Sequence, residues 1–267
     1  ILAGALAAPL APAAAAPAGA PAVHFAVKGD WGDGGADQRA VTAQMCRVQR
    51  ASPFAFVLTT GDNFYNPDGV ATAGNFTRPE ACLLRAGVRW RAAWGNHDLG
   101  GDGTATALRT PQRYYQFASG PLRVVVLDAN RPDDPAQLAF LRGALSRARE
   151  PVRVVAFHQP AYTAGLHAPG EAQQRLWAPL FRRYGVALVL QGHNHAYERM
   201  VVGGVTYITT GGGGAPVYPC VRPAPGLRRC LMLNHFLDVT ATAAGLDVRV
   251  VGKDGTTLER VRVPARA

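Results

Sequence analysis

Short apolar runs recur along the chain, and each is followed by a turn signal built from Gly, Asp, Asn or Pro. Apolar runs of this length, bounded by turn residues, are typical of buried β-strands. The pattern predicts strands over residues 23–27, 54–58, 88–94, 122–127, 152–157, 186–190 and 205–208.

Several segments between these runs repeat their apolar residues at helical spacing. In residues 171–184, for example, Leu176, Leu180 and Tyr184 share one helix face. We predict helices over residues 37–50, 135–149 and 171–184. Strands and helices thus alternate, which indicates an α/β fold built from βαβ units.

The C-terminal part alternates polar and apolar positions without a helical segment. It predicts further strands over residues 235–239, 246–251 and 257–263. Asp254 and Gly255, between the last two, predict a hairpin turn.

The first 22 residues are uncharged and rich in Ala and Pro, and we interpret them as the end of a secretory signal. A low-complexity tail is the alternative. Pro9 and Pro12 interrupt the apolar run before it is long enough to span a bilayer, and no other segment of the sequence could do so. The chain has 267 residues, 48% of them hydrophobic and 17% charged, an ordinary globular balance. We therefore expect an exported protein with a single domain over residues 23–267.

The four cysteines support export rather than metal binding. Cys46, Cys82, Cys220 and Cys230 have no CxxC spacing, which disfavours a zinc ribbon or a thioredoxin-type motif. An exported chain would oxidise them, and four cysteines allow three pairings. We favour Cys46–Cys82 and Cys220–Cys230, and free buried thiols are the alternative.

The formal net charge is +10, from 28 basic and 18 acidic residues, which favours anionic partners. The basic residues are spread along the chain, and no long basic run with interleaved aromatic residues occurs. The sequence therefore gives little support to a nucleic-acid partner.

Polar side chains follow five of the predicted strands. They are Asp30, Asp62 with Tyr65, Asn96, His158, and the pair His193 and His195. Ligands of open α/β sheets bind beyond the carboxyl ends of the strands. Since side chains two apart on a strand point the same way, we expect His193 and His195 to leave their strand together, facing one spot. Each residue alone has an ordinary explanation as a turn, cap or buried residue, but their joint occurrence indicates one site.

Carboxylate, amide and imidazole ligands without cysteine suit hard or borderline metal ions. A catalytic zinc ion usually takes three protein ligands and a water. The strand ends offer more donors than one such ion needs. Two ions about 3.5–4 Å apart, bridged by a carboxylate, would use all of them.

The blocks GDWG, GDNFY, GNHD, HQP and GHNHAYER resemble the five-block signature of calcineurin-like metallophosphoesterases, over about residues 29–214. The GDNFY block resembles that of purple acid phosphatases, including the small tartrate-resistant type. The resemblance implies a four-layer αββα sandwich, in which two mixed β-sheets are flanked by helices. It also implies a phosphatase that hydrolyses small phosphate monoesters by attack of a metal-bound hydroxide. We expect this enzyme to be secreted and monomeric.

The resemblance also implies a ligand set. One metal, Fe(III), would be held by Asp30, Tyr65 and His195, and the other, Fe(II), Zn or Mn, by Asn96, His158 and His193. Asp62 would bridge the two ions. A phenol with a pKa near 10 ionises at neutral pH only beside a strongly charged cation, which agrees with a trivalent ion at Tyr65.

Two further histidines are candidates for catalysis. His97 follows Asn96 in the GNHD block, and the resemblance implies that it binds phosphate and protonates the leaving group. His167 lies nine residues after His158, as a substrate-facing histidine does in the tartrate-resistant group, although the surrounding residues differ. A phosphodiesterase or nucleotidase on the same metal core is one alternative. A catalytically silent polyanion-binding protein with structural metals is another.

Overall fold

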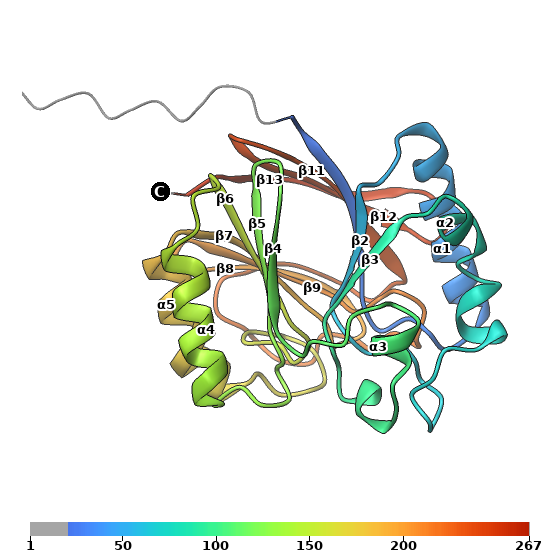
Figure 1. Ribbon diagram of the computed structural model, residues 1–267, viewed down its shortest axis with the longest axis horizontal. Helices are drawn as coiled ribbons and strands as arrows, with labels where there is room; N and C mark the ends of the chain where they lie inside the picture. Colours follow the sequence, from blue (N-terminus) through green and yellow to red (C-terminus); the bar gives the residue numbers. More distant parts are fainter. Residues whose placement is uncertain (1–20, 267) are drawn as a thin grey trace, which may run out of the picture.

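Two β-sheets pack face to face between two helical layers in the computed structural model, which describes residues 21–266 (Figure 1). Residues 1–20, most of the expected leader 1–22, lie outside the described part. The helices α1 (Ala36–Ala51) and α2 (Ala81–Arg85) lie on the right of Figure 1, and α4 (Pro135–Ser146) and α5 (Ala178–Arg183) on the left. The predicted αββα sandwich is confirmed.

The first sheet combines strands from the two ends of the described chain. Its strand order is β13-β12-β11-β1-β2-β3. The sheet is mixed, because β1 pairs in parallel with β2 and antiparallel with β11. The bounds are β1 (Val23–Lys28), β2 (Phe56–Thr59), β3 (Arg89–Ala92), β11 (His235–Thr242), β12 (Gly245–Gly252) and β13 (Thr257–Pro264).

The second sheet has a parallel centre and antiparallel edges, in the order β10-β8-β9-β7-β6-β5-β4. The bounds are β4 (Tyr115–Ser119), β5 (Leu122–Val126), β6 (Val152–Ala156), β7 (Val186–Gln191), β8 (Tyr197–Val202), β9 (Val205–Thr210) and β10 (Leu227–Leu231).

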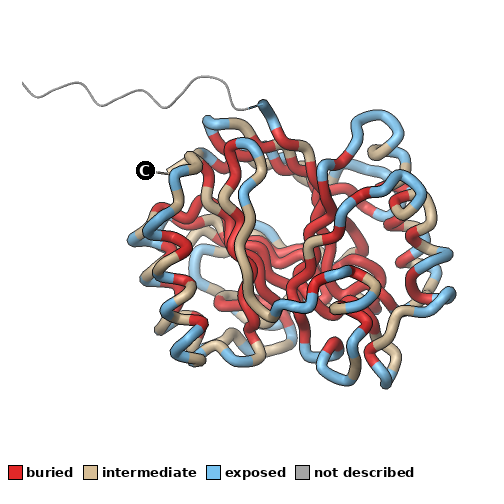
Figure 2. The backbone as a smooth tube through the Cα atoms, in the orientation of Figure 1, coloured by how far each residue is buried: buried red, intermediate tan, exposed pale blue. Residues whose placement is uncertain are grey.

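The side chains of each central strand alternate between two apolar layers. In β1, Phe25 and Val27 face the other sheet, whereas Ala26 packs with the helical layer around Met45. Figure 2 shows the buried strands at the centre and exposed residues around them. A one-residue shift of β1 would exchange its two faces, and full burial of one large aliphatic side chain contributes about 1.5–3 kcal/mol. Core packing therefore fixes the position of Asp30, just beyond the strand.

The predicted elements agree with the structure except in one helix and in three strands that the apolar pattern did not indicate, β4, β8 and β10. The edge strands β4 and β10 carry half-exposed, polar residues, so no apolar run indicates them. The helix predicted over 171–184 contains a π-helical segment (Gln173–Trp177) before α5. Pro179, near the start of α5, lacks the N–H that a regular α-helical hydrogen bond would need. Short helical segments in loops are η1 (Ala73–Thr77), η2 (His97–Gly100) and α3 (Gly103–Thr106).

Both predicted disulfides are present. Cys46–Cys82 joins α1 to α2, and Cys220–Cys230 joins a loop to β10. Within residues 21–266, no helix combines the length and the apolar composition that a bilayer span requires.

Candidate metal centre

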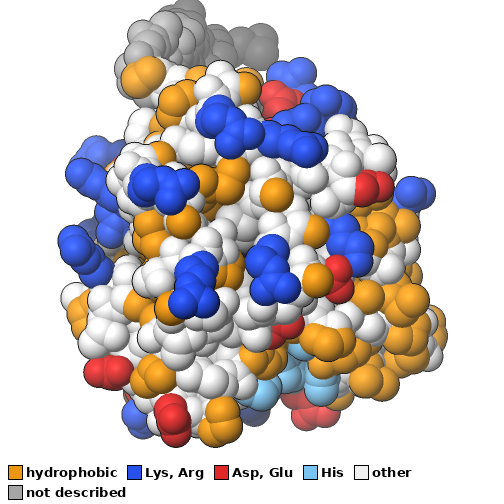
Figure 3. Space-filling view, turned by 90° about the vertical axis from the view of Figure 1, so that its right-hand side faces the viewer, with side chains coloured by type: hydrophobic (Ala, Val, Ile, Leu, Met, Phe, Trp, Pro, Cys, Tyr) orange, Lys and Arg blue, Asp and Glu red, His pale blue; other side chains and the backbone are white. Residues whose placement is uncertain are grey.

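The carboxyl ends of parallel strands from both sheets meet at one edge of the molecule. Asp30 follows β1 and Asp62 follows β2 in the first sheet, while His158 follows β6 and His193 follows β7 in the second. In the view of Figure 3, histidine side chains gather at the lower margin. The strand ends therefore carry the candidate ligands to one place, as expected for α/β sheets.

One cluster of donor atoms consists of Asp62, His158 and His193, whose donor atoms lie within 4.8 Å of one another. His158 Nε2 is 3.2 Å from Asp62 Oδ2 and 3.3 Å from His193 Nδ1. The other ring nitrogen of His158 lies 2.9 Å from the carbonyl oxygen of Thr60, to which it donates its proton in the neutral ring. The lone pair of His158 Nε2 then faces the carboxylate, as in a ligand oriented by a backbone carbonyl.

A second cluster consists of Asp30, Tyr65 and His195. The Tyr65 hydroxyl lies 2.9 Å from His195 Nε2 and 3.3 Å from Asp30 Oδ1, and these two atoms are 3.4 Å apart. His195 Nδ1 is 2.7 Å from the carbonyl oxygen of Pro216, so His195 is oriented in the same way as His158.

Asp62 connects the two clusters. Its Oδ2 atom is 3.2 Å from His158 Nε2 and 3.4 Å from the Tyr65 hydroxyl. Its Oδ1 atom accepts a hydrogen bond of 2.9 Å from the backbone N–H of His97. One buried carboxylate thus reaches both donor clusters while the neighbouring loop holds it in place.

The backbone at the site is strained. Asp30, Asp62 and His193 have positive φ angles of 57°, 48° and 70°, a region that residues other than glycine rarely adopt. Such conformations persist where the surrounding structure enforces them, and they occur often at functional sites. Gly95 packs directly against Asp62, and a Cβ atom at this position would lie 2.0 Å from Asp62 Oδ1.

Buried charges shift the pKa values of the donor groups. Burial opposes the charged form of His158, but the carboxylates of Asp62 and Asp30 outweigh it and raise its pKa to about 9. Burial and the nearby His158 charge lower the pKa of His193 to about 4. Burial, together with Asp30 and Asp62, raises the pKa of Tyr65 well above its ordinary value.

The raised pKa values of His158 and Tyr65 both reflect the negative charge of Asp30 and Asp62. Asp30 and Asp62 are buried, and their oxygens lie 3.2–3.4 Å from Nε2 of His158 and His195, where protonated rings would pair with them. A metal ion would balance the same carboxylate charge, and on binding it would displace the ring protons and accept the lone pairs of the neutral imidazoles. The donor set, of carboxylate, imidazole and phenol, also suits hard or borderline ions.

The remaining predicted residues surround the two clusters. His97 is half exposed, with its ring 4.6 Å from that of Tyr65 and its Nε2 atom 4.0 Å from Asp62 Oδ2. The His167 ring lies 4.3 Å from that of His193. Asn96 is exposed on the turn after β3, and its side chain makes no hydrogen bond to another described residue.

The histidine pair differs from the expectation in its backbone. β7 ends at Gln191, and the positive φ of His193 breaks the strand geometry, so strand alternation does not govern the pair. The His193 ring lies 5.0 Å from that of His158, whereas His195 faces Tyr65. His193 and His195 therefore belong to different donor clusters, as in the ligand set that the resemblance implied, rather than facing one spot.

Three further residues shape the site. Two of them lie in the sequence blocks already described but were not assigned a role, and the third lies in no motif. Asp98, of the GNHD block, is buried and accepts hydrogen bonds from Gly95 and Asn63 N–H groups. Asn194, between the two histidines, is buried and binds the main chain of His167. Tyr218 stacks on His195 with ring centroids 4.2 Å apart, and no motif marks it.

Three comparisons place this geometry among known proteins. The family described as calcineurin-like phosphoesterase matches residues 23–197. Tartrate-resistant acid phosphatase type 5 from Homo sapiens is 27% identical over 302 residues, covering 92% of this chain and 92% of that protein.

Two solved structures show the same fold. GAP50, titled the anchor in the inner membrane complex of Plasmodium, matches with a TM-score of 0.77 at 16% identity, over 92% of this chain and 90% of that one. Purple acid phosphatase PPD1 from yellow lupin matches with a TM-score of 0.71 at 16% identity, over 93% of this chain and 55% of that one.

Proposed function

The chain belongs to the calcineurin-like phosphoesterase family and is similar to acid phosphatases, and we propose that it is an exported metal-dependent phosphatase of phosphate monoesters. The observation that carries the proposal is the shared carboxylate of Asp62, which reaches a cluster containing a tyrosine and a second cluster containing two histidines. A centre of this composition fits two metal ions of different character.

Asp30, Tyr65 and His195 would hold one ion, and His158, His193 and Asn96 the other, with Asp62 between them. The mutual distances of 2.9–3.4 Å among the donor atoms of the first cluster support the first set. The donor atoms of Asp62, His158 and His193 support the second. Asn96 would complete it by turning its side chain inward, since its neighbour His97 already contacts Asp62.

The environment of Tyr65 supports a trivalent ion in the first position. Burial and two carboxylates raise the pKa of its phenol, so the protein by itself keeps the group neutral. Ionisation at neutral pH would need a cation strong enough to reverse that effect. We propose Fe(III) there, and Fe(II), Zn or Mn at the position of His158, His193 and Asn96.

Bound at these residues, two such ions would supply Lewis acidity for the phosphate charge and for the nucleophilic water. The chain's own groups then bind and protonate. His97 is exposed beside Asp62, where its ring can reach an ester oxygen and give the leaving group a proton. His167 lies against His193 and would contact the substrate from the opposite wall. Tyr218, stacked on His195, would close the site on that side.

The two disulfides support export, since disulfides persist in oxidising compartments. Their presence in protein recovered from the secreted fraction would test this part of the proposal. Reduced cysteines in protein retained inside the cell would contradict it.

The function can be tested on one preparation of the full chain. We expect two metal ions per chain, one of them iron, a visible absorption band from the tyrosinate, and hydrolysis of an aryl phosphate monoester faster than of the matching diester. Tyr65→Phe is the matched control, because it removes a single oxygen and should abolish the band. Faster diester hydrolysis would identify a phosphodiesterase instead. Metal at full occupancy without turnover of either ester would overturn the proposed activity.

A further inference from the structure

A basic trough lies on the helical layer formed by α1 and α2, away from the residues of the metal centre. It has a volume of about 420 Å³, and five exposed arginines line it. We refer to these residues as the arginine trough; they are Arg39, Arg47, Arg50, Arg78 and Arg85.

The arginines form two rows. Arg39, Ala43, Arg47 and Arg50 are spaced by four, four and three residues, so they share the outer face of α1. With a rise of 1.5 Å per residue, this row is about 16 Å long. The other row consists of Arg78, just before α2, and Arg85, the last residue of α2.

The floor of the trough is rigid and neutral. The disulfide Cys46–Cys82 ties the two rows together, and its lining between the arginines consists of Ala43, Pro79 and Ala81 besides the two cysteines. Small and apolar residues leave the guanidinium groups as the polar partners that a bound molecule would meet.

The charge of the trough is poorly compensated. Across the described residues, none of its arginines forms an ion pair, although arginines elsewhere pair with Asp and Glu. Glu80, the acidic residue nearest to α2 in sequence, is buried and bound to Lys28. Asp33 and Asp37 lie at one end only, where α1 begins.

The orientation of α1 relates the trough to the metal centre. β1 and β2 are parallel and α1 connects them, so α1 runs back from the edge that carries Asp30 and Asp62. The Arg39 end of the row is therefore nearest that edge. Figure 3 shows this face, with Lys and Arg side chains distributed above the histidines at its margin.

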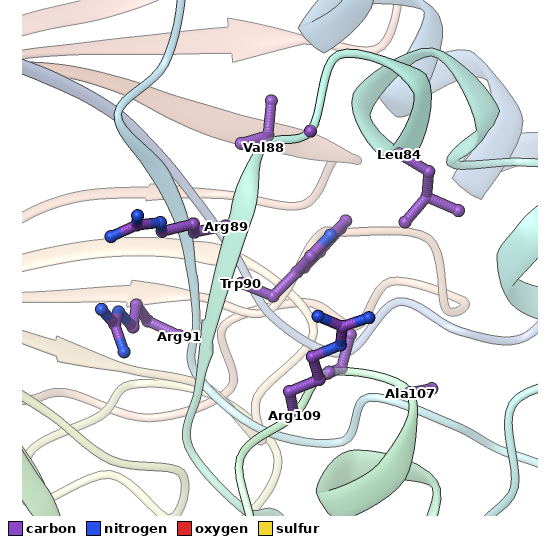
Figure 4. Close-up of a pocket in the computed structure, with 9 residues that line it drawn as sticks. Leu84, Val88, Arg89, Trp90, Arg91, Ala107 and Arg109 are labelled. Atoms are coloured by element: carbon purple, nitrogen blue, oxygen red, sulfur yellow. The ribbon is translucent and has the colours of Figure 1, made fainter.

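A second basic depression of about 510 Å³, at the outer edge of β3, is less suited to one ligand (Figure 4). Its Arg89 and Arg91 point to one side of the strand, whereas Arg109 lies on the other side with Trp90. Arg91 also stacks over the ring of Phe117. The arginines of this depression are divided between two faces of β3. The arginines of the trough, in contrast, line a single depression.

We propose that the arginine trough binds an extended, soluble polyanion carrying phosphate groups, such as linear polyphosphate. Guanidinium groups bind phosphate oxygens in pairs of hydrogen bonds, and two rows of them match a linear chain of anions better than a single charged group. The recessed floor favours a chain that can enter the trough over the flat surface of a lipid bilayer. The proposal goes beyond the hydrolysis of a phosphoester, because binding here needs neither metal ion nor turnover.

The test compares two variants of the full chain that lose the same charge. The first removes three arginines of the trough by Arg47→Gln, Arg50→Gln and Arg85→Gln. The control removes three exposed arginines around the end of α4 by R142Q, R147Q and R149Q. Binding of fluorescent linear polyphosphate is measured by anisotropy at several salt concentrations, and phosphate release is followed in the same samples.

We expect the trough variant to bind at least about tenfold more weakly, and the control variant within about twofold of the parent. The difference should shrink at high salt, because exposed charges are screened. Turnover of a small aryl phosphate should be the same in all three proteins. Binding of polyphosphate by a protein that does not turn over the aryl phosphate would count against the proposed phosphatase and leave the trough proposal intact.

Equal weakening in both variants would show that net charge alone attracts the polymer, and would overturn the proposal. Binding of phosphatidylglycerol vesicles that depends on the trough, without such binding of polyphosphate, would assign it to a membrane surface instead. If the triple variant fails to fold, the single variant R47E is compared with R147E. Each reverses one exposed charge, and we expect R47E to weaken polyphosphate binding more, because Arg47 lies in the middle of the row.

Discussion

The buried ion pair between Lys28 and Glu80 offers the sharpest test of how the site is supported. Lys28 is the last residue of β1, two positions before Asp30, and both members of the pair are fully buried. Lys28 Nζ lies 2.7 Å from Glu80 Oε1 and 3.9 Å from the centre of the Trp31 ring. Burial lowers the pKa of Lys28, although Glu80 opposes that effect. The pair therefore carries a desolvation cost that only mutual contact offsets.

Removing one partner exposes that cost. In Lys28→Met, the Glu80 carboxylate keeps the hydrogen bonds from Gln38 and Thr42 but loses its counter-charge, and its other oxygen already has no partner. Breaking a buried pair in this way costs about 3–5 kcal/mol, a large part of the roughly 5–15 kcal/mol that stabilises most domains. For a chain of this size the expected fall in Tm is roughly 10 °C.

The measurement is the free energy of unfolding from denaturant titration, supported by thermal unfolding, with both disulfides oxidised. The matched variant is Lys28→Met combined with Glu80→Gln, which removes both charges and keeps the acceptor for Gln38 and Thr42. We expect the double variant to recover at least half of the loss. Equal destabilisation of the single and double variants would refute the reasoning, because the loss would then come from packing around Trp31 rather than from an uncompensated charge.

The remaining predictions concern three histidines. His97→Ala should lower kcat by about 100-fold or more if His97 protonates the leaving group, and an unchanged pH profile of kcat would remove it from the mechanism. Asn194→Ala removes the hydrogen bonds that hold the main chain of His167, so kcat/KM should fall by about tenfold, and by no more than in His167→Ala. A tenfold fall in Asn194→Ala while His167→Ala stays fully active would show that Asn194 does not act through His167. The hydrogen bond that protonated His24 donates to the Asp238 carboxylate raises the pKa of His24, so this contact stabilises the fold below about pH 6.5 and its contribution fades as pH rises through the raised pKa. His24→Gln should therefore cost more stability at pH 6 than at pH 9, and an equal cost at both would contradict the assignment.

The sequence indicates most of the central strands, because strands buried on both faces have continuous apolar runs. Residues at the ends of β1, β2, β6 and β7 could be assigned to one site because parallel strands bring their carboxyl ends to one edge. The edge strands β4 and β10 could not be found, since a strand with one exposed face and few apolar residues has no distinct pattern.

The candidate site shows the same division. Asp30, Asp62, Tyr65 and His158 lie in recognisable blocks, and the structure brings them together. The direction of His193 could not be derived from strand alternation, because a positive φ redirects its side chain beyond the end of β7. Nor could Tyr218 be found, since a contact with His195 from a distant loop leaves no local pattern.

The pairing of β1 with β11 has a consequence for how the protein is made. Val23 lies opposite Ala241, so the strand that ends just before Asp30 gains one of its two neighbours only when the last part of the chain is available. Contacts so distant in sequence form slowly, and a growing chain on the ribosome has β1 beside β2 with its other edge open. We therefore expect β1, and with it Asp30, to reach its final position only once residues 235–242 are available to pair with it.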